Sequence, residues 1–413
     1  MLRPRVLATA LVLATAPVPV TALVLATPLA GAAPAAAFDE TDLKRKIAGA
    51  MRKAGSTSGA YVSEAATGRS LYGLRDTKRR IPASVQKLYT TATAILTLGP
   101  TATLETSAVT TGSIDGEGVL HGDLVLVGRG DPSFGSAKSA QLARAVRNAG
   151  IRRVTGAVVG DESYFDRRRA ARFDGYDGEV GGVLSALAYG RGIFGGRAQV
   201  DAGRFAARRF DVELDRAGVR SAKSARAGSA PAGAVRVAGV SSASIAELSR
   251  LVNVPSDNFA AEMLLKGIGA HAGGSGSTTG GAAVVRTTLG SFGVRPRVSD
   301  GSGLSRANRT SPRQVVRLLE HVHGGGSRSA FRASLAVAGR SGTVRGRMRG
   351  TLAQDNCHVK TGTLRDVSAL AGYCRARDGR EISFALLMNR VNPSSARALQ
   401  DRIAVAIARL DGT

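Results

Sequence analysis

A serine and a lysine stand three residues apart at the start of a predicted helix, as Ser84 and Lys87. The run from Ser84 to Leu98 has no internal glycine or proline and ends at Gly99-Pro100, a strong helix stop. Residues three apart lie on one helix face, so the Ser84 hydroxyl and the Lys87 amine can meet. A hydroxyl beside an amine is a nucleophile beside a base, provided that burial or another cation lowers the lysine pKa of about 10.4. Alone, this spacing more often marks an ordinary surface serine and lysine.

Two further motifs lie far downstream. Ser256 and Asn258 supply a hydroxyl and an amide in a turn that runs into a helix, with Asp257 between them as a turn-former. A predicted strand then carries Lys360, Thr361, Gly362 and Thr363. Because Gly362 has no side chain, a substrate can lie against that strand edge. S-D-N alone also fits a helix cap, and K-T-G a strand turn, but S-x-x-K, S-D-N and K-T-G in this order form a recognised set for acyl transfer to serine.

The elements that must position these motifs follow from hydrophobic periodicity. Helices are predicted at 41–54, 245–252, 258–266, 280–290 and 312–322, and strands at 60–62, 70–72, 357–364, 367–374 and 382–389. Ser311 and Pro312 suit the N-cap and first position of their helix. A last helix carries Leu399, Ile403, Ile407 and Leu410 on one face. We therefore expect residues 38–104 plus 239–413 to form an α/β catalytic domain of the α+β type, with an antiparallel sheet flanked by helices.

Residues 105–238 differ from their flanks in the pattern of predicted elements, and we interpret them as an insertion. Short strands with glycine-rich turns are predicted at 107–111, 120–127 and 156–160, with a helix at 139–148. Residues 166–207 are rich in Gly and Arg and weakly periodic, and 221–234 have the composition of a loop or linker. The sequence thus predicts a smaller, mostly-β inserted domain.

The chain has two cysteines, Cys357 and Cys374. If Arg365-Asp366 forms a two-residue hairpin turn, the two cysteines face each other at a non-hydrogen-bonded pair, where side chains approach most closely. We therefore predict a cross-strand disulfide, which an exported chain can form.

The first 37 residues have the pattern of an export signal. Arg3 and Arg5 precede an apolar stretch, and Ala35-Ala36-Ala37 offers a cleavage site before Phe38. A retained membrane anchor is the alternative, because the stretch is long and interrupted by prolines. We expect an exported protein located in the cell envelope or outside the cell.

The formal net charge is +26, but residues 105–238 carry 20 basic and 15 acidic side chains, only +5 of it. Attraction to an anionic cell envelope fits this charge better than binding to nucleic acid, because aromatic residues make up only 4% of the chain and no nucleic-acid motif is present.

On these motifs the chain resembles the penicillin-binding D-alanyl-D-alanine carboxypeptidase/endopeptidase family, in its low-molecular-mass class C branch. Further stretches that fit are 126–132, 160–166, 300–306 and 369–373. The family inserts domains between its first two motifs, and here 172 residues separate Ser84 from Ser256. The second half of the insert, about 181–230, matches poorly and is short. Where the family has a Trp and an Asn-rich segment, this chain has Ala188-Tyr189-Gly190-Arg191.

The resemblance implies a role for each motif residue. Ser84 attacks the carbonyl of the penultimate D-alanine and forms an acyl-enzyme, while Lys87 takes its proton. Ser256 relays a proton to the leaving amine, and Asn258 binds the substrate backbone and helps hold Lys87. Lys360 would supply a positive field that keeps Lys87 neutral. Thr361 and Thr363, beside Gly362, would help bind the terminal carboxylate.

The resemblance also implies the partners of the protein. Peptidoglycan stem peptides would be the substrates and β-lactam antibiotics covalent inhibitors, and no metal or cofactor is expected.

Three alternatives remain open at this point. A class A-like serine β-lactamase shares the three motifs, but its first two are much closer together, and Glu262 follows Asn258 on one helix rather than in a separate loop. A catalytically silent envelope-binding protein is the second alternative. A polynucleotide binder is the third.

Overall fold

The computed structural model describes residues 10–11, 13–14, 16, 38–173 and 175–412. The predicted leader, residues 1–37, lies almost wholly outside the described residues, and the fold below begins at residue 38. None of the helices in the described ranges combines the length and apolar character that a membrane span requires.

A six-stranded sheet carries the third motif. Its strands, in spatial order β12-β13-β14-β15-β1-β2, are antiparallel throughout, as predicted. They span Ala336–Val337 (β12), His358–Leu364 (β13), Val367–Arg375 (β14), Glu381–Asn389 (β15), Gly59–Glu64 (β1) and Ser70–Leu74 (β2). Strands from both ends of the chain therefore join in one sheet, and β13 pairs with β14 in the predicted register, with Thr361 opposite Leu370.

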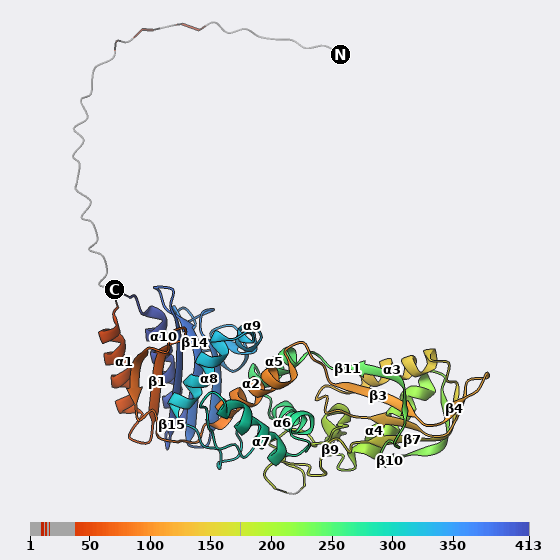
Figure 1. The fold of residues 1–413 in the computed structure, drawn as a ribbon. Helices are drawn as coiled ribbons and strands as arrows, with labels where there is room; N and C mark the ends of the chain where they lie inside the picture. The colour runs from red at the N-terminus through yellow and green to blue at the C-terminus, as the bar shows by residue number, and fades with distance from the viewer. Residues whose placement is uncertain (1–9, 12, 15, 17–37, 174, 413) are drawn as a thin grey trace. The chain divides into compact units, whose positions relative to one another are not determined.

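Helices cover both faces of this sheet (Figure 1). Helices α1 (Glu40–Lys53) and α10 (Pro393–Arg409) lie on one face, and α8 (Pro312–Gly324) lies on the other, where α2 (Lys87–Leu98) and α9 (Arg328–Ala333) join the same core. Helices α5 (Ile245–Asn253), α6 (Asn258–Ala272) and α7 (Thr278–Gly290) pack around α2. Strand β14 alternates between two cores: Leu370 packs with α1 and α10, whereas Ala369 and Ala371 pack with α2 and α5 to α8. As predicted, Ser311 caps α8 and Pro312 begins it.

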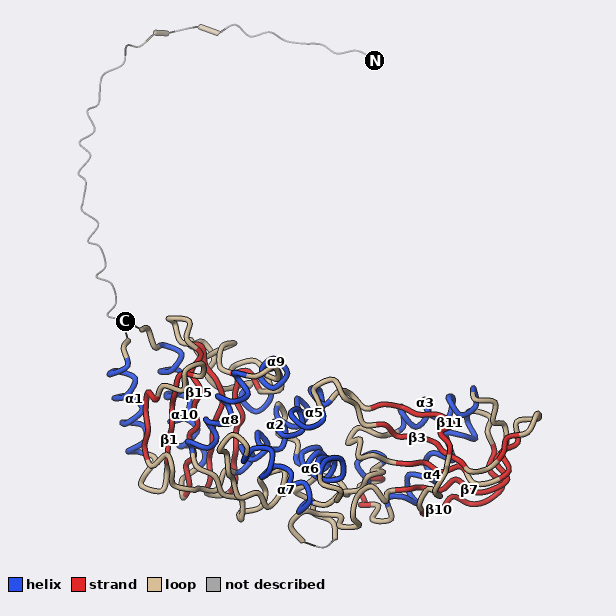
Figure 2. Tube along the Cα trace, viewed as in Figure 1, coloured by secondary structure: helices blue, strands red, loops and turns tan. Residues whose placement is uncertain are grey.

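A second sheet, of seven strands, is built from the chain between the first two motifs (Figure 2). Its strands are β3 (Glu105–Thr110), β4 (Ser113–Ile114), β5 (Val119–His121), β6 (Leu124–Val127), β7 (Arg153–Asp161), β10 (Arg220–Gly228) and β11 (Val235–Ser241). Strands β5, β6 and β10 run parallel to β7, and the remaining pairs are antiparallel. Helices α3 (Ser136–Asn148) and α4 (Ala202–Arg216) pack with it, and a small hairpin of β8 (Ile193–Phe194) and β9 (Arg197–Ala198) precedes α4.

Two local expectations in this part were wrong, and one helix was not predicted. The predicted linker 221–234 is largely strand β10, because pairing with β7 overrides a composition poor in β-formers. The predicted strand 120–127 is two strands, interrupted at Gly122 and Asp123. Helix α4 begins inside the weakly periodic stretch, and its buried Ala206, Phe210 and Leu214 form a four-residue repeat that could have revealed it. The domain boundaries at 104/105 and 238/239 stay a prediction.

Candidate active site

Ser84 lies in a short 3₁₀ turn, Ala83–Gln86, and Lys87 is the first residue of α2. The backbone is held tightly here: Ala83 has φ +48°, and a Cβ on Gly303, itself at φ +88°, would lie 2.0 Å from the Ala83 carbonyl oxygen. Only glycine allows the chain at 303 to approach this closely. The segment 300–305 therefore packs directly against the turn that presents Ser84.

Lys87 is fully buried and its amine has three partners. Nζ lies 2.9 Å from Ser84 Oγ, 2.7 Å from Asn258 Oδ1 and 2.7 Å from the Ser302 carbonyl oxygen. A neutral amine can donate to the last two, which only accept, and keep its lone pair for the Ser84 hydroxyl proton. The geometry is thus that of a nucleophile already hydrogen-bonded to its base.

Burial lowers the pKa of Lys87 to about 8, while the carboxylates of Asp300, Glu262 and Asp257 oppose the shift. Burial, and not the positive field of Lys360 that was expected from the sequence, is therefore the main cause of the low Lys87 pKa. Burial first, and then the charge of Lys87, hold the pKa of Lys360 well below its usual value, and the repulsion between the two ammonium groups acts on both of them. Two buried amines this strongly coupled disfavour the doubly charged state.

Glu262 holds the backbone segment whose carbonyl oxygen contacts Lys87. This fully buried carboxylate on α6 accepts hydrogen bonds from the backbone N–H groups of Gly301 and Ser302, at 2.8 to 3.1 Å. The same two residues offer their carbonyl oxygens to Thr90 and Lys87. Burial, and then Asp300, raise the pKa of Glu262 to about 7. Glu262 was not predicted as a site residue, because its partners Gly301 and Ser302 are remote from it in the sequence.

The second motif is anchored by residues from the chain between the first two motifs. Asp257 caps α6, accepting from the Ala260 N–H, and also forms a bidentate ion pair with Arg191 at 2.7 and 2.9 Å. Asn258 Nδ2 donates to the Glu179 carbonyl oxygen. These contacts hold a turn in which Ser256 has φ +65°. No local sequence signal links Arg191 or Glu179 to this turn.

The third motif meets the other two through Lys360 and Gly362. Lys360 Nζ donates to Ser256 Oγ at 2.8 Å and to the Thr361 carbonyl oxygen at 2.9 Å. A Cβ at Gly362 would lie 2.6 Å from the Pro82 carbonyl oxygen and 3.1 Å from Ser84 N. Strand β13 therefore lies directly against the nucleophile turn, and the structure brings all three predicted motifs together.

The two threonines of the motif alternate with Lys360 and Gly362 along β13. Thr361 Oγ1 lies 2.7 Å from Thr343 Oγ1, and exposed Thr363 accepts from Arg397 Nη2 at 3.3 Å. Thr343 and Arg397 were not predicted from the sequence. Arg397 places a guanidinium beside the hydroxyl expected to bind a carboxylate.

The predicted disulfide is present, joining Cys357 and Cys374, whose Cα atoms are 4.2 Å apart. In the part of the chain that the structure describes, no three His, Cys, Asp or Glu side chains are grouped so as to hold a metal ion.

A serine bonded to a buried lysine, a second serine bonded to a second lysine, and a strand edge beside both define a serine hydrolase that works by acyl transfer. The sequence matches the D-Ala-D-Ala carboxypeptidase 3 (S13) family over residues 42–181 and 173–410. The chain belongs to this family and is a serine-type peptidase, which confirms the resemblance drawn from the three motifs.

Individual relatives agree with the family. The chain is 30% identical to the D-alanyl-D-alanine carboxypeptidase of Actinomadura sp. (strain R39), over 87% of this chain and 82% of that one. Among solved structures it is similar to penicillin binding protein 4 (dacB) from Haemophilus influenzae, with a TM-score of 0.74 and 19% identity over 86% of this chain and 97% of that one. A structure of the same protein complexed with a novel β-lactam has a TM-score of 0.70, with 21% identity over the same shares of each chain. These structural likenesses show the fold.

Proposed function

We propose that the protein hydrolyses the D-Ala–D-Ala bond of peptidoglycan stem peptides through an acyl-enzyme on Ser84. The observation that carries this is the three-way coordination of Lys87 Nζ by Ser84, Asn258 and the Ser302 carbonyl. The Lys87 lone pair takes the Ser84 hydroxyl proton as Oγ attacks the carbonyl of the penultimate D-alanine.

The N–H groups of Ser84 and Thr363 are proposed to stabilise the oxyanion. Support comes from the close approach of Gly362 to Ser84 N, which puts the two donors on facing segments. One such donor is worth on the order of 3 kcal/mol in the activation barrier.

Ser256 is proposed to relay the proton that Lys87 took from Ser84 to the leaving amine of the terminal D-alanine as the C–N bond breaks, which returns Lys87 to its neutral form. Its hydroxyl oxygen accepts from Lys360 Nζ at 2.8 Å, which leaves its own O–H free to donate. Water then attacks the acyl-enzyme, with Lys87 again as base, and releases the shortened peptide.

The terminal carboxylate of the substrate is proposed to bind at Thr361 and Thr363, with the Arg397 guanidinium beside them. The 3.3 Å contact between Arg397 and Thr363 supports this, because a guanidinium and a hydroxyl together can bind both oxygens of a carboxylate. β-Lactams, which carry a carboxylate next to a reactive carbonyl, are proposed to acylate Ser84 in the same orientation.

We also propose that the protein is exported by the leader of residues 1–37 and works in the cell envelope, with an uncleaved anchor as the alternative. The net charge of +26 would hold it near an anionic envelope. The disulfide supports an oxidising compartment.

The test is Ser84→Ala, with Ser291→Ala at the exposed end of α7 as a matched control. A defined pentapeptide and a cross-linked dimer are incubated with each protein and the products are read by mass spectrometry. We expect wild type and the control to release D-alanine and to bind a fluorescent penicillin covalently, and Ser84→Ala to do neither.

Other outcomes identify the alternatives. Labelling that survives Ser84→Ala removes Ser84 from the mechanism, and rapid release of hydrolysed penicillin indicates a β-lactamase. Peptidoglycan binding without any product indicates a silent envelope-binding protein. The ratio of the pentapeptide and dimer products measures the balance of carboxypeptidase and endopeptidase activity.

A further inference from the structure

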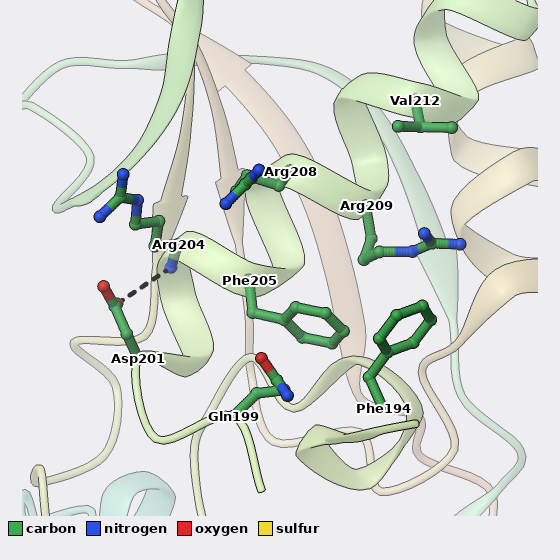
Figure 3. A pocket seen from close by; sticks show the side chains of 8 residues that line it. All are labelled: Phe194, Gln199, Asp201, Arg204, Phe205, Arg208, Arg209 and Val212. Carbon is green, nitrogen blue, oxygen red and sulfur yellow. Dashed lines mark hydrogen bonds between the residues drawn. The ribbon is translucent and has the colours of Figure 1, made fainter. Parts of the chain in front are cut away.

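A hollow of about 520 Å³ lies between the β8–β9 hairpin and the exposed face of α4. Figure 3 shows the rings of Phe194 and Phe205 side by side beneath the helix, with arginines extending from the helix around them. Its lining consists of Phe194, Gln199, Asp201, Arg204, Phe205, Arg208, Arg209 and Val212. None of these residues takes part in the mechanism proposed above.

Aromatic rings are concentrated at this place. Aromatic residues make up only 4% of the chain, yet Phe134, Tyr189, Phe205 and Phe194 form a continuous run with successive centroids 5.8 to 5.9 Å apart. Phe134 and Tyr189 are buried and Phe205 is partly buried, whereas Phe194 at the outer end is 54% exposed. A ring fixed by packing and open to solvent is a platform for an apolar ligand face.

Most of the charged side chains that line the hollow are arginines. Arg204 and Arg208, four residues apart on one side of α4, are exposed, and in the described part of the chain neither guanidinium has an ion pair. Arg209 lies over the rings of Tyr189 and Phe194, and its buried Nε has no hydrogen-bond partner among the described residues. The acidic lining residue Asp201 accepts from the Arg204 backbone N–H as helix cap. The hollow is therefore suited to an anionic ligand that also has an apolar face.

The hollow is linked to the catalytic site through Arg191. Arg191, which pairs with Asp257 next to Ser256, is three residues before Phe194. Three residues span at most about 11 Å. A ligand in the hollow can therefore be part of the same polymer that reaches Ser84.

We propose that this hollow binds the glycan strand of polymeric peptidoglycan, with a sugar ring on Phe194 and stem-peptide carboxylates on Arg204 and Arg208. This inference rests on the proposed function, because it takes peptidoglycan as the substrate. It adds that the enzyme prefers polymer to free peptide. The sugar supplies the apolar ring face and the stem peptides supply the anions, which matches the two chemistries of the lining.

The test compares Phe194→Ala and the double variant Arg204→Glu/Arg208→Glu with wild type. The matched control is Arg144→Glu/Arg220→Glu, which makes the same charge change at two exposed arginines elsewhere in the 105–238 segment, neither of which has an ion pair in the described residues. Each protein is assayed for kcat and KM on a soluble pentapeptide and on sonicated peptidoglycan.

For the double variant we expect kcat/KM on sonicated peptidoglycan to fall on the order of tenfold through KM, with less loss for Phe194→Ala. Values on the pentapeptide should stay within about twofold of wild type, because the hollow holds no catalytic group. Control and wild type should match on both substrates. Unchanged kinetics on the polymer, or an equal loss in the control, would overturn the proposal.

Two further experiments test the identity of the ligand and its binding in the absence of turnover. Inorganic polyphosphate is added as a competitor: if it binds in an Arg204- and Arg208-dependent way while peptidoglycan kinetics do not depend on them, the ligand is a phosphate polymer and the proposal is wrong. Sedimentation of Ser84→Ala protein with insoluble peptidoglycan, with and without the hollow substitutions, tests binding without turnover. Failure of wild type to cleave the pentapeptide would contradict the proposed function alone.

Discussion

Asn258→Asp is the sharpest test of how Lys87 is kept neutral. Asn258 Oδ1 lies 2.7 Å from Lys87 Nζ, and aspartate has the same shape with an added negative charge. With a pKa of about 8, roughly a quarter of Lys87 is neutral at pH 7.5, against about one in a thousand for a lysine with the ordinary value of 10.5. A carboxylate at this distance favours the ammonium and raises the lysine pKa by about 1–3 units.

The acylation rate with a fluorescent penicillin, measured from pH 6 to 10.5, reads this pKa. Only neutral Lys87 can accept a proton, so the wild-type rate should rise with pH and level off above about 8. For Asn258→Asp the rising part of the plot of acylation rate against pH should move to higher pH by at least one unit. The rate at pH 7.5 should therefore fall about tenfold or more and recover in alkali.

Asn258→Ala is the control, because it removes the same acceptor without adding charge. Its rate should be lower at every pH, and the rising part of its plot should not move to higher pH. If the Asn258→Asp protein is folded by circular dichroism and the rising part of its plot stays in place or moves to lower pH, then neutral Lys87 is not the base that limits acylation.

Two substitutions test the frame of the site. Replacing both Cys357 and Cys374 with alanine should lower the free energy of unfolding by about 3 kcal/mol, since the bond closes a loop between residues 17 apart; an unchanged melting temperature under oxidising conditions would contradict this. Gly362→Ala places a Cβ 2.6 Å from the Pro82 carbonyl oxygen and should displace β13, so penicillin acylation should fall on the order of a hundredfold. Gly290→Ala, where the added Cβ meets nothing within 4 Å, is its control, and equal rates in the two variants would refute the packing argument.

Much of the frame could be predicted because it depends on local geometry. The two-residue turn at Arg365-Asp366 sets the register of β13 and β14, and that register alone brings Cys357 opposite Cys374. The cap at Ser311 and Pro312 is equally local. Where local preference is weak, as in 221–228, pairing with a strand some seventy residues earlier decided the conformation.

The amino-acid sequence by itself determined which groups can do chemistry: Ser84 beside Lys87, and the S-D-N and K-T-G motifs in order. Only the tertiary structure decided the protonation state of Lys87 and which remote residues hold these groups in place. The low pKa of Lys87 comes from burial, opposed by Glu262 and Asp300, and its third partner is a carbonyl at residue 302. Desolvation and charge act through space between segments remote in the sequence, so no spacing along the chain encodes them.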